Sequence, residues 1–322
     1  MDIKAYIYHK RAEKYCDCQD WFGINVQTNR IAVSDGMSQS IFPQWWAEIL
    51  GKAFLKEGKI PFDNIWPYQQ VWQDRVREEI DKQESEGKNP WLLRDMFAER
   101  SGAGATICGF EWDKESWKCQ CLGDSCLIKV NKDYSIEIIT SQEGQFDNHP
   151  DYLDSFTNGR GEPVFKTGDF NLNAILMVSD PFAELFQIHQ KDRDFICKRL
   201  NELHSLSDHE SFVNLVEYWR NKFNLHNDDS TLIFIDNFRS TSLNIIWQDN
   251  LRQLCLDEKE TDVVKQKNKV LQEEKEKAEA KFKSSVVDVL KYYPPGRKRS
   301  KNKVFDWLKE MYVSIVDTFV KK

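Results

Sequence analysis

An apolar run that stops at an Asp-Gly pair constrains this chain more than any other stretch. Residues 31–33 predict a short buried strand, and Asp35 and Gly36 follow it after a single serine. An acid followed by glycine at the end of a strand can present a carboxylate and a bare backbone carbonyl at one point. Asp-Gly is also a common turn signal, so a metal-binding role for Asp35 depends on further acids at comparable strand ends.

The segment 173–180 repeats this pattern, because an apolar run is again followed by a serine and an aspartate, Asp180. Pro181 comes next and is well suited to the first turn of a helix. Asp180 is therefore either an acid of a functional site or only the N-cap of that helix.

Further acids lie next to other predicted strands. Asp228 and Asp229 immediately precede the run 231–235, where the alternative is a solvated loop. Asp124 lies between the two strand-patterned halves of 119–130, which predicts a hairpin with an acid at its turn. These acids are far apart in the sequence, so only folding could bring them together.

Composition limits the class of protein. A chain of 322 residues exceeds the usual size of one domain, so one large domain with an extension, or two domains, is expected. Hydrophobic residues make up 40% of the chain, enough for a sizeable core. The net charge of −7 argues against a nucleic-acid binder, which normally presents a basic face. No apolar stretch approaches the ~20 residues of a membrane-spanning helix.

Eight cysteines are scattered along the chain, and its first residues do not resemble a secretory signal. A reducing, cytoplasmic location is therefore expected. Cys16 with Cys18, and Cys119 with Cys121, form C-x-C pairs that could be taken for a zinc site, but zinc sites usually use C-x₂-C spacing. Burial of small thiol side chains in the core is the preferred interpretation.

The rest of the pattern alternates strands and helices. Residues 101–110 are small and lead into a strand, and no Lys-Ser or Lys-Thr follows them, so a tight entry into a buried strand explains them better than a phosphate-binding loop. Other strands are predicted at 5–9 and 20–26, and helices at 45–55, 69–86, 90–99, 195–206 and 211–223.

Separated aspartates at strand ends suit hard divalent cations. Mg²⁺ and Mn²⁺ take oxygen ligands and are often held by a few carboxylates. Two such ions about 4 Å apart can activate a shared water and clamp a phosphoryl group. The six histidines show no metal-ligand spacing, and no Cys-His or Ser-His-Asp arrangement is visible. Metal-activated water is therefore the expected nucleophile.

Six short motifs follow one another along about residues 1–240: Cys18-Gln19-Asp20, Val33-Ser34-Asp35-Gly36-Met37-Ser38, Gly102-Ala103-Gly104-Ala105-Thr106, Leu122-Gly123-Asp124-Ser125, Val178-Ser179-Asp180 and Asp228-Asp229-Ser230-Thr231. In type and order this series resembles the metal-dependent protein serine/threonine phosphatases of the 2C type. The segments 9–20 and 146–153 are similar to the divergent bacterial branch of that family.

The resemblance implies an α+β fold, a four-layer α-β-β-α sandwich of two antiparallel sheets flanked by helices, with a metal cleft at one edge. It also implies two Mg²⁺ or Mn²⁺ ions and a weaker third. A hydroxide bridging two ions would attack phosphorus in line, and no phosphoenzyme would form.

By the same resemblance, the expected metal ligands are Asp20, Asp35, Gly36, Asp124, Asp180 and Asp228, and the catalytic set is Asp35, Asp180 and Asp228. Asp35 would bridge both ions. Asp180 and Asp228 would hold the first ion, while the Gly36 carbonyl would join the second. Asp20 would act on the second ion from outside or through water, and Asp124 would bind the third ion together with Asp180.

The chain departs from the family pattern at several positions. Ser38 and Pro181 stand where the family commonly has glycine, and Cys126 stands where it has arginine. None of these changes removes a carboxylate. The phosphate-binding arginine of the family has no counterpart at the same offset before Asp20. A nearby cation could replace it as a point charge, and the candidates are Arg11, Lys10 and Lys14.

Residues 1–256 are expected to form the phosphatase domain and 257–322 a helical extension. Residues 257–283 carry many Glu and Lys and one apolar residue per heptad, which favours a solvated helix over a coiled coil. A basic run, 297–303, follows, and 304–319 has an apolar stripe at helical spacing. That stripe could dock on the core, on a partner protein or on a membrane surface.

Two functions remain open at this point. Retention of every expected carboxylate favours a metal-dependent phosphatase for phosphoserine and phosphothreonine in proteins, with the targets of a partner kinase as substrates in signalling. The missing arginine favours a catalytically weak or inactive relative that binds phosphoproteins or scaffolds a complex.

Overall fold

The computed structural model describes residues 1–142, 144, 149–240 and 242–291, with the backbone alone for 278, 279 and 281–291. The predictions made for 146–148, for 297–303 and for 304–319 lie outside the described residues. The chain divides into two units, Met1–Leu254 and Cys255–Lys322.

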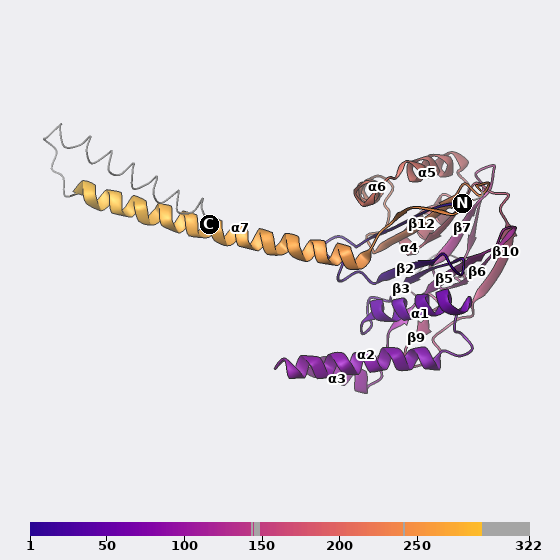
Figure 1. Ribbon diagram of the computed structural model, residues 1–322, viewed down its shortest axis with the longest axis horizontal. Helices are drawn as coiled ribbons and strands as arrows, with labels where there is room; N and C mark the ends of the chain where they lie inside the picture. The colour runs from indigo at the N-terminus through magenta and orange to yellow at the C-terminus, as the bar shows by residue number, and fades with distance from the viewer. Residues whose placement is uncertain (143, 145–148, 241, 292–322) are drawn as a thin grey trace. The chain divides into compact units, whose positions relative to one another are not determined.

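Two sheets form the centre of the first unit (Figure 1). The six-stranded sheet has the order β13 (Asn244–Gln248), β1 (Asp2–Tyr8), β12 (Ser230–Asp236), β11 (Ala174–Val178), β7 (Cys126–Val130) and β8 (Ile136–Ile139). The five-stranded sheet has the order β10 (Val164–Asp169), β6 (Ser116–Leu122), β5 (Ile107–Trp112), β3 (Arg30–Asp35) and β2 (Asp20–Asn25). A short pair consists of β4 (Gly104–Ala105) and β9 (Leu153–Asp154).

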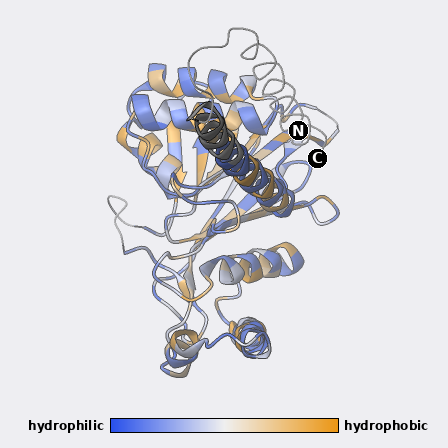
Figure 2. Ribbon diagram, turned by 90° about the vertical axis from the view of Figure 1, so that its left-hand side faces the viewer, coloured by the Kyte–Doolittle hydropathy of each residue, from blue (hydrophilic) through white to orange (hydrophobic). Residues whose placement is uncertain are grey.

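Helices flank both sheets. On the side of the five-stranded sheet lie α1 (Pro43–Glu57), α2 (Trp66–Ser85) and α3 (Trp91–Ala98). On the side of the six-stranded sheet lie α4 (Asp180–Ile188), α5 (Arg193–Ser205) and α6 (His209–Lys222). Figure 2 shows that these helices carry both hydrophilic and hydrophobic residues, as expected for helices covered on one side. The predicted α-β-β-α sandwich is confirmed, with one difference: β13 pairs with β1 in parallel.

The long apolar runs in the sequence come from strands that are covered on both faces. In β11, Ile175 and Met177 pack in the central core between the sheets. Leu176, between them in sequence, points to the opposite face and packs with Phe182 of α4 and Trp219 of α6. Alternating side chains therefore fill two different cores, and both must be apolar.

The hairpin predicted around Gly123 and Asp124 is wrong. The strands before and after this turn, β6 and β7, belong to different sheets, so the chain crosses here from one layer to the other. Gly123 has a φ of +88°, and a Cβ at this position would lie 2.4 Å from the carbonyl oxygen of Asp151. The alternating pattern identifies two strands and a tight turn, but it does not identify their partners.

The second C-x-C pair belongs to the core, as predicted. Cys119 and Cys121 are buried in the central cluster, and Sγ of Cys121 lies 3.4 Å from Sγ of Cys108. Cys18 is also buried, whereas Cys16 is half-buried. All eight cysteines are free thiols.

The helix α7 (Leu251–Lys291) begins at the end of the first unit and continues through the described part of the second. Among its described side chains, the apolar residues between 256 and 271 are exposed, with Val264 at 55% and Leu271 at 44%. This exposure agrees with the solvated helix predicted for 257–283 where its side chains are described, at 257–277 and 280. Within the described residues, no helix combines the length and the apolar character needed to cross a membrane.

Candidate metal centre

The register of the β2–β3 pair places Asp20 directly opposite Asp35. Like charges in directly opposed positions destabilise an antiparallel pair. Asp20 is only 1% exposed, so solvent screens little of this repulsion. The arrangement disfavours ionisation of both acids unless a cation lies between them.

Gly36 follows Asp35 where the β2–β3 ladder ends. Its amide donates to the Gln19 carbonyl at 3.2 Å, but the Gln19 amide donates to Oδ2 of Asp229 at 2.7 Å instead of returning a bond to Gly36. Gly36 also forms an antiparallel bridge with Ala105, and there the backbone hydrogen bonds are made by the residues on either side of Gly36, not by Gly36 itself. In the described chain, therefore, neither neighbouring segment donates a backbone hydrogen bond to the Gly36 carbonyl, which is left unused. A Cβ on residue 36 would lie 2.7 Å from the backbone of Pro43, so the position requires glycine.

Asp180 and Asp228 come from neighbouring antiparallel strands. Asp180 lies two residues after β11, and Asp228 lies two residues before β12. Ser179 is the N-cap of α4 and Asp180 is its first residue, so the interpretation of Asp180 as the N-cap is wrong. A carboxylate in the first turn is favoured by the helix dipole. One oxygen of Asp180 and one of Asp228 lie within 4.8 Å of each other and of a ring nitrogen of His226.

Asp124 lies at the crossing between the two sheets and is 6% exposed. Its charge raises the pKa of both Asp35 and Asp180, after the larger effect of burial on each. The crossing therefore brings Asp124 to the same edge of the sandwich as the other acids. This placement follows from the chain changing sheets, which a simple hairpin would not provide.

The five acids act on one another electrostatically. Burial raises the pKa of Asp35 well above its usual value, and the charges of Asp20, Asp180, Asp124 and Asp228 raise it further. Burial followed by the charge of Asp124 does the same for Asp180. Like charges this close disfavour the ionised forms, because each carboxylate repels the next and burial keeps away the water that would screen the repulsion.

Asp20 provides a test of whether a cation fits. Burial and the charge of Asp229 raise its pKa to about 8, while hydroxyls of Thr231 and Ser179 lower it in part. Yet neither carboxylate oxygen accepts a hydrogen bond of normal geometry from the described residues. Buried carboxylates are ordinarily hydrogen-bonded or bind metal. An all-oxygen set with an unused carbonyl nearby fits Mg²⁺ or Mn²⁺.

The three candidate phosphate-binding cations differ in position. Nζ of Lys10 lies 3.6 Å from Oδ1 of Asp228, at the acidic cluster. Burial lowers the pKa of Lys10, but the charges of Asp228, Asp229 and Glu13 outweigh it and give a net rise. Arg11 instead donates from Nε to Glu217 of α6 at 2.9 Å. The side chain of Lys14 is exposed.

Three residues at this edge were given no role in the site from the sequence. Asp229 is buried and accepts the amides of Lys10 at 2.9 Å and Gln19 at 2.7 Å. Arg220, also buried, donates to the Asp228 carbonyl at 2.7 Å and so fixes the backbone beside a candidate ligand. His226 precedes Asp228 by two residues, and this short spacing was the only sequence signal for it.

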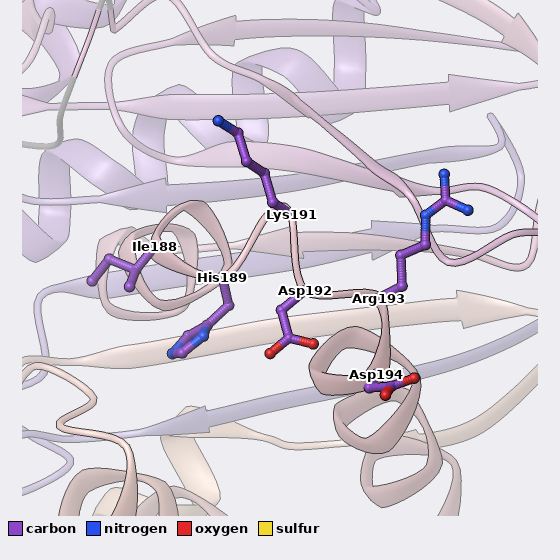
Figure 3. A pocket seen from close by; sticks show the side chains of 6 residues that line it. All are labelled: Ile188, His189, Lys191, Asp192, Arg193 and Asp194. Atoms are coloured by element: carbon purple, nitrogen blue, oxygen red, sulfur yellow. The ribbon is translucent and has the colours of Figure 1, made fainter.

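A pocket of about 560 Å³ lies elsewhere, at the turn between α4 and α5 (Figure 3). It is lined by Ile188, His189, Lys191, Asp192, Arg193 and Asp194. The side chains of Lys191 and Arg193 fan away from Asp192 instead of converging on a common point. None of the clustered acids lines this pocket.

No family model and no curated protein matches the chain. Solved structures that it resembles include a serine phosphatase and serine/threonine phosphatases. A bacterial serine phosphatase is 16% identical, with 72% of this chain and 96% of that one covered and a TM-score of 0.46. Serine/threonine phosphatase Stp1 from Staphylococcus aureus is 16% identical, with 73% and 94% covered and a TM-score of 0.46. The catalytic domain of PstP in complex with two manganese ions is 14% identical, with 73% and 96% covered and a TM-score of 0.44.

Proposed function

We propose that the protein is a metal-dependent phosphatase that hydrolyses phosphoserine and phosphothreonine in proteins. The observation that carries this proposal is the convergence of Asp20, Asp35, Asp124, Asp180 and Asp228, from separate elements, at one edge of the sandwich. Their mutual repulsion and the unused Gly36 carbonyl support a site for divalent cations.

The ions are Mg²⁺ or Mn²⁺, two in number with a weaker third. Asp35 would bridge two of them, Asp180 and Asp228 would hold one, and the Gly36 carbonyl with Asp20 would serve the other. Asp124 would hold the third together with Asp180. When bound, the cations would supply an activated water and neutralise charge on a phosphoryl group.

Lys10 is the residue of the chain that we assign to the substrate phosphate. Its ammonium group lies at the acidic cluster, and its backbone amide is fixed by Asp229. A flexible point charge can follow a phosphoryl group without the two-point geometry of arginine. Arg11 is held by Glu217 and faces α6, so it is the weaker candidate.

The test is release of phosphate from a phosphothreonine peptide with Mn²⁺ or Mg²⁺. Asp35→Ala and Asp180→Ala are compared with the parent and with Asp74→Ala, which changes an aspartate whose side chain is 65% exposed on α2. We expect activity in the parent and in Asp74→Ala and a loss of at least about 100-fold in the two site variants. A parent no more active than Asp35→Ala would refute the enzyme. Metal-independent binding of the phosphopeptide would then favour the phosphoprotein-binding or scaffold alternative.

A further inference from the structure

His226 occupies a position that the acidic motifs do not account for. It lies on the segment between α6 and β12, and one of its ring nitrogens lies within 4.8 Å of a carboxylate oxygen of both Asp180 and Asp228. Its side chain is exposed, and both aspartates are partly exposed. Three potential ligand atoms from three side chains thus lie close together at the surface of the cluster.

The buried residue Asp20 gives independent support for a cation at this point. It is 1% exposed, and neither of its oxygens accepts a hydrogen bond of normal geometry from the described residues. Its charge acts on Asp180, and that of Asp228 acts on Asp20. The buried carboxylate of Asp20 thus interacts electrostatically with both aspartates of the group. Among the described residues, the ammonium group of Lys10 lies 3.6 Å from Asp228.

The geometry permits coordination after a small movement. Ligand atoms about 2.1–2.2 Å from one ion are separated by roughly 3–4.4 Å. In the structure the three ligand atoms lie within 4.8 Å of one another, so some of these separations can be slightly larger than coordination requires. The exposed imidazole can close the difference by rotating about its two side-chain torsions, because the packed core does not restrain it.

We propose that His226 is a third protein ligand of the ion held by Asp180 and Asp228, so that this ion has two carboxylates and one imidazole. The inference rests on the proposed function, since it assigns a new ligand to the same centre. Imidazole binds transition metals better than Mg²⁺. His226 would therefore bias this site toward Mn²⁺.

The test uses the full chain, stripped with EDTA and titrated with Mn²⁺ alone. Pulsed electron paramagnetic resonance detects the coupling of bound Mn²⁺ to a directly ligated ¹⁴N nucleus. We expect this coupling in the parent, its loss in His226→Gln and its retention in His204→Gln, which changes a half-exposed histidine near the end of α5. We also expect His226→Gln to weaken Mn²⁺ binding about 10-fold or more and Mg²⁺ binding less than about 3-fold.

The outcomes separate this inference from the proposed function. Mn²⁺ bound to the parent without ¹⁴N coupling would overturn the role of His226, whether or not the protein hydrolyses phosphopeptides. A ¹⁴N coupling that His226→Gln removes would support the role even if no phosphate were released, and in that case only the proposed function would fail. A parent that binds no Mn²⁺ would overturn both.

Discussion

Asn in place of Asp20 should change how the stability of the metal-free protein depends on pH. Burial and the charge of Asp229 raise the pKa of Asp20 from 3.8 to about 8 in the folded state. The folded state therefore holds the proton more tightly than the unfolded state. The stability linked to this group is fully present below pH 3.8 and is lost as the pH rises to about 8. The parent should thus be less stable at pH 8 than at pH 5.

The magnitude follows from the same pKa values. Each unit of difference corresponds to about 1.4 kcal/mol. The difference in proton binding between the folded and unfolded states can be integrated from pH 5 to pH 8. For Asp20 this gives a loss of about 4 kcal/mol in the unfolding free energy of the parent. Asn carries no titrating proton, so Asp20→Asn should lack this loss. Removal of one negative charge also relieves Asp35, which acts in the same direction.

The assay is urea unfolding in EDTA at several pH values, followed by fluorescence of the 11 tryptophans. The unfolding free energy of the parent should fall relative to that of Asp20→Asn by about 4 kcal/mol from pH 5 to pH 8. Asp74→Asn, an exposed substitution, should follow the parent. Excess Mn²⁺ should restore stability to the parent at pH 8, because a ligand that binds only the folded state stabilises it. Parallel pH profiles for parent and Asp20→Asn would refute the reasoning.

Three further outcomes are expected. Gly36→Ala should weaken Mn²⁺ binding about 10-fold, measured by titration, and should lower the unfolding free energy by roughly 1–3 kcal/mol, because its Cβ would clash with Pro43. Lys10→Met should raise KM for a phosphopeptide about 10-fold, whereas Arg11→Met should leave KM unchanged. Equal effects of the two substitutions on KM would contradict the assignment of phosphate binding to Lys10. Trp219→Ala should cost about 3–5 kcal/mol in urea unfolding, because the side chain is fully buried between α6 and the six-stranded sheet.

The strands at the centre of the fold could be predicted because their surroundings force a simple pattern. Ile175, Leu176 and Met177 are all apolar because one face of β11 meets the other sheet and the other meets helices. The pattern around Asp124 predicted two strands correctly but gave the wrong partner for each. Periodicity reports which faces are buried, whereas pairing depends on contacts between residues far apart in sequence.

The candidate site shows the same division. Asp35 and Asp180 could be selected because each ends an apolar run, which is a local signal. Asp20 lies opposite Asp35 because of the register of the β2–β3 pair. Neither segment of the sequence predicts this register by itself. His226 was passed over because its partners come from folding and not from histidine spacing. Lys10 and Arg11 are adjacent in the chain, yet one reaches Asp228 and the other reaches α6.

The pair Asp228-Asp229 shows why a motif alone cannot assign roles within a site. Oδ2 of Asp229 accepts a hydrogen bond from the Gln19 amide, so this amide does not donate to the Gly36 carbonyl as it would in a regular antiparallel pair. Oδ1 of Asp229 accepts a hydrogen bond from the backbone amide of Lys10. This bond fixes the backbone of Lys10, whose ammonium group lies near Asp228. Asp228 thus lies near the cation of Lys10, while Asp229 leaves the Gly36 carbonyl without its ladder donor and positions the lysine. Two consecutive acids that look equivalent in the sequence therefore differ in role: Asp229 binds two backbone amides, whereas the proposed role of Asp228 requires an oxygen that is open to a metal ion.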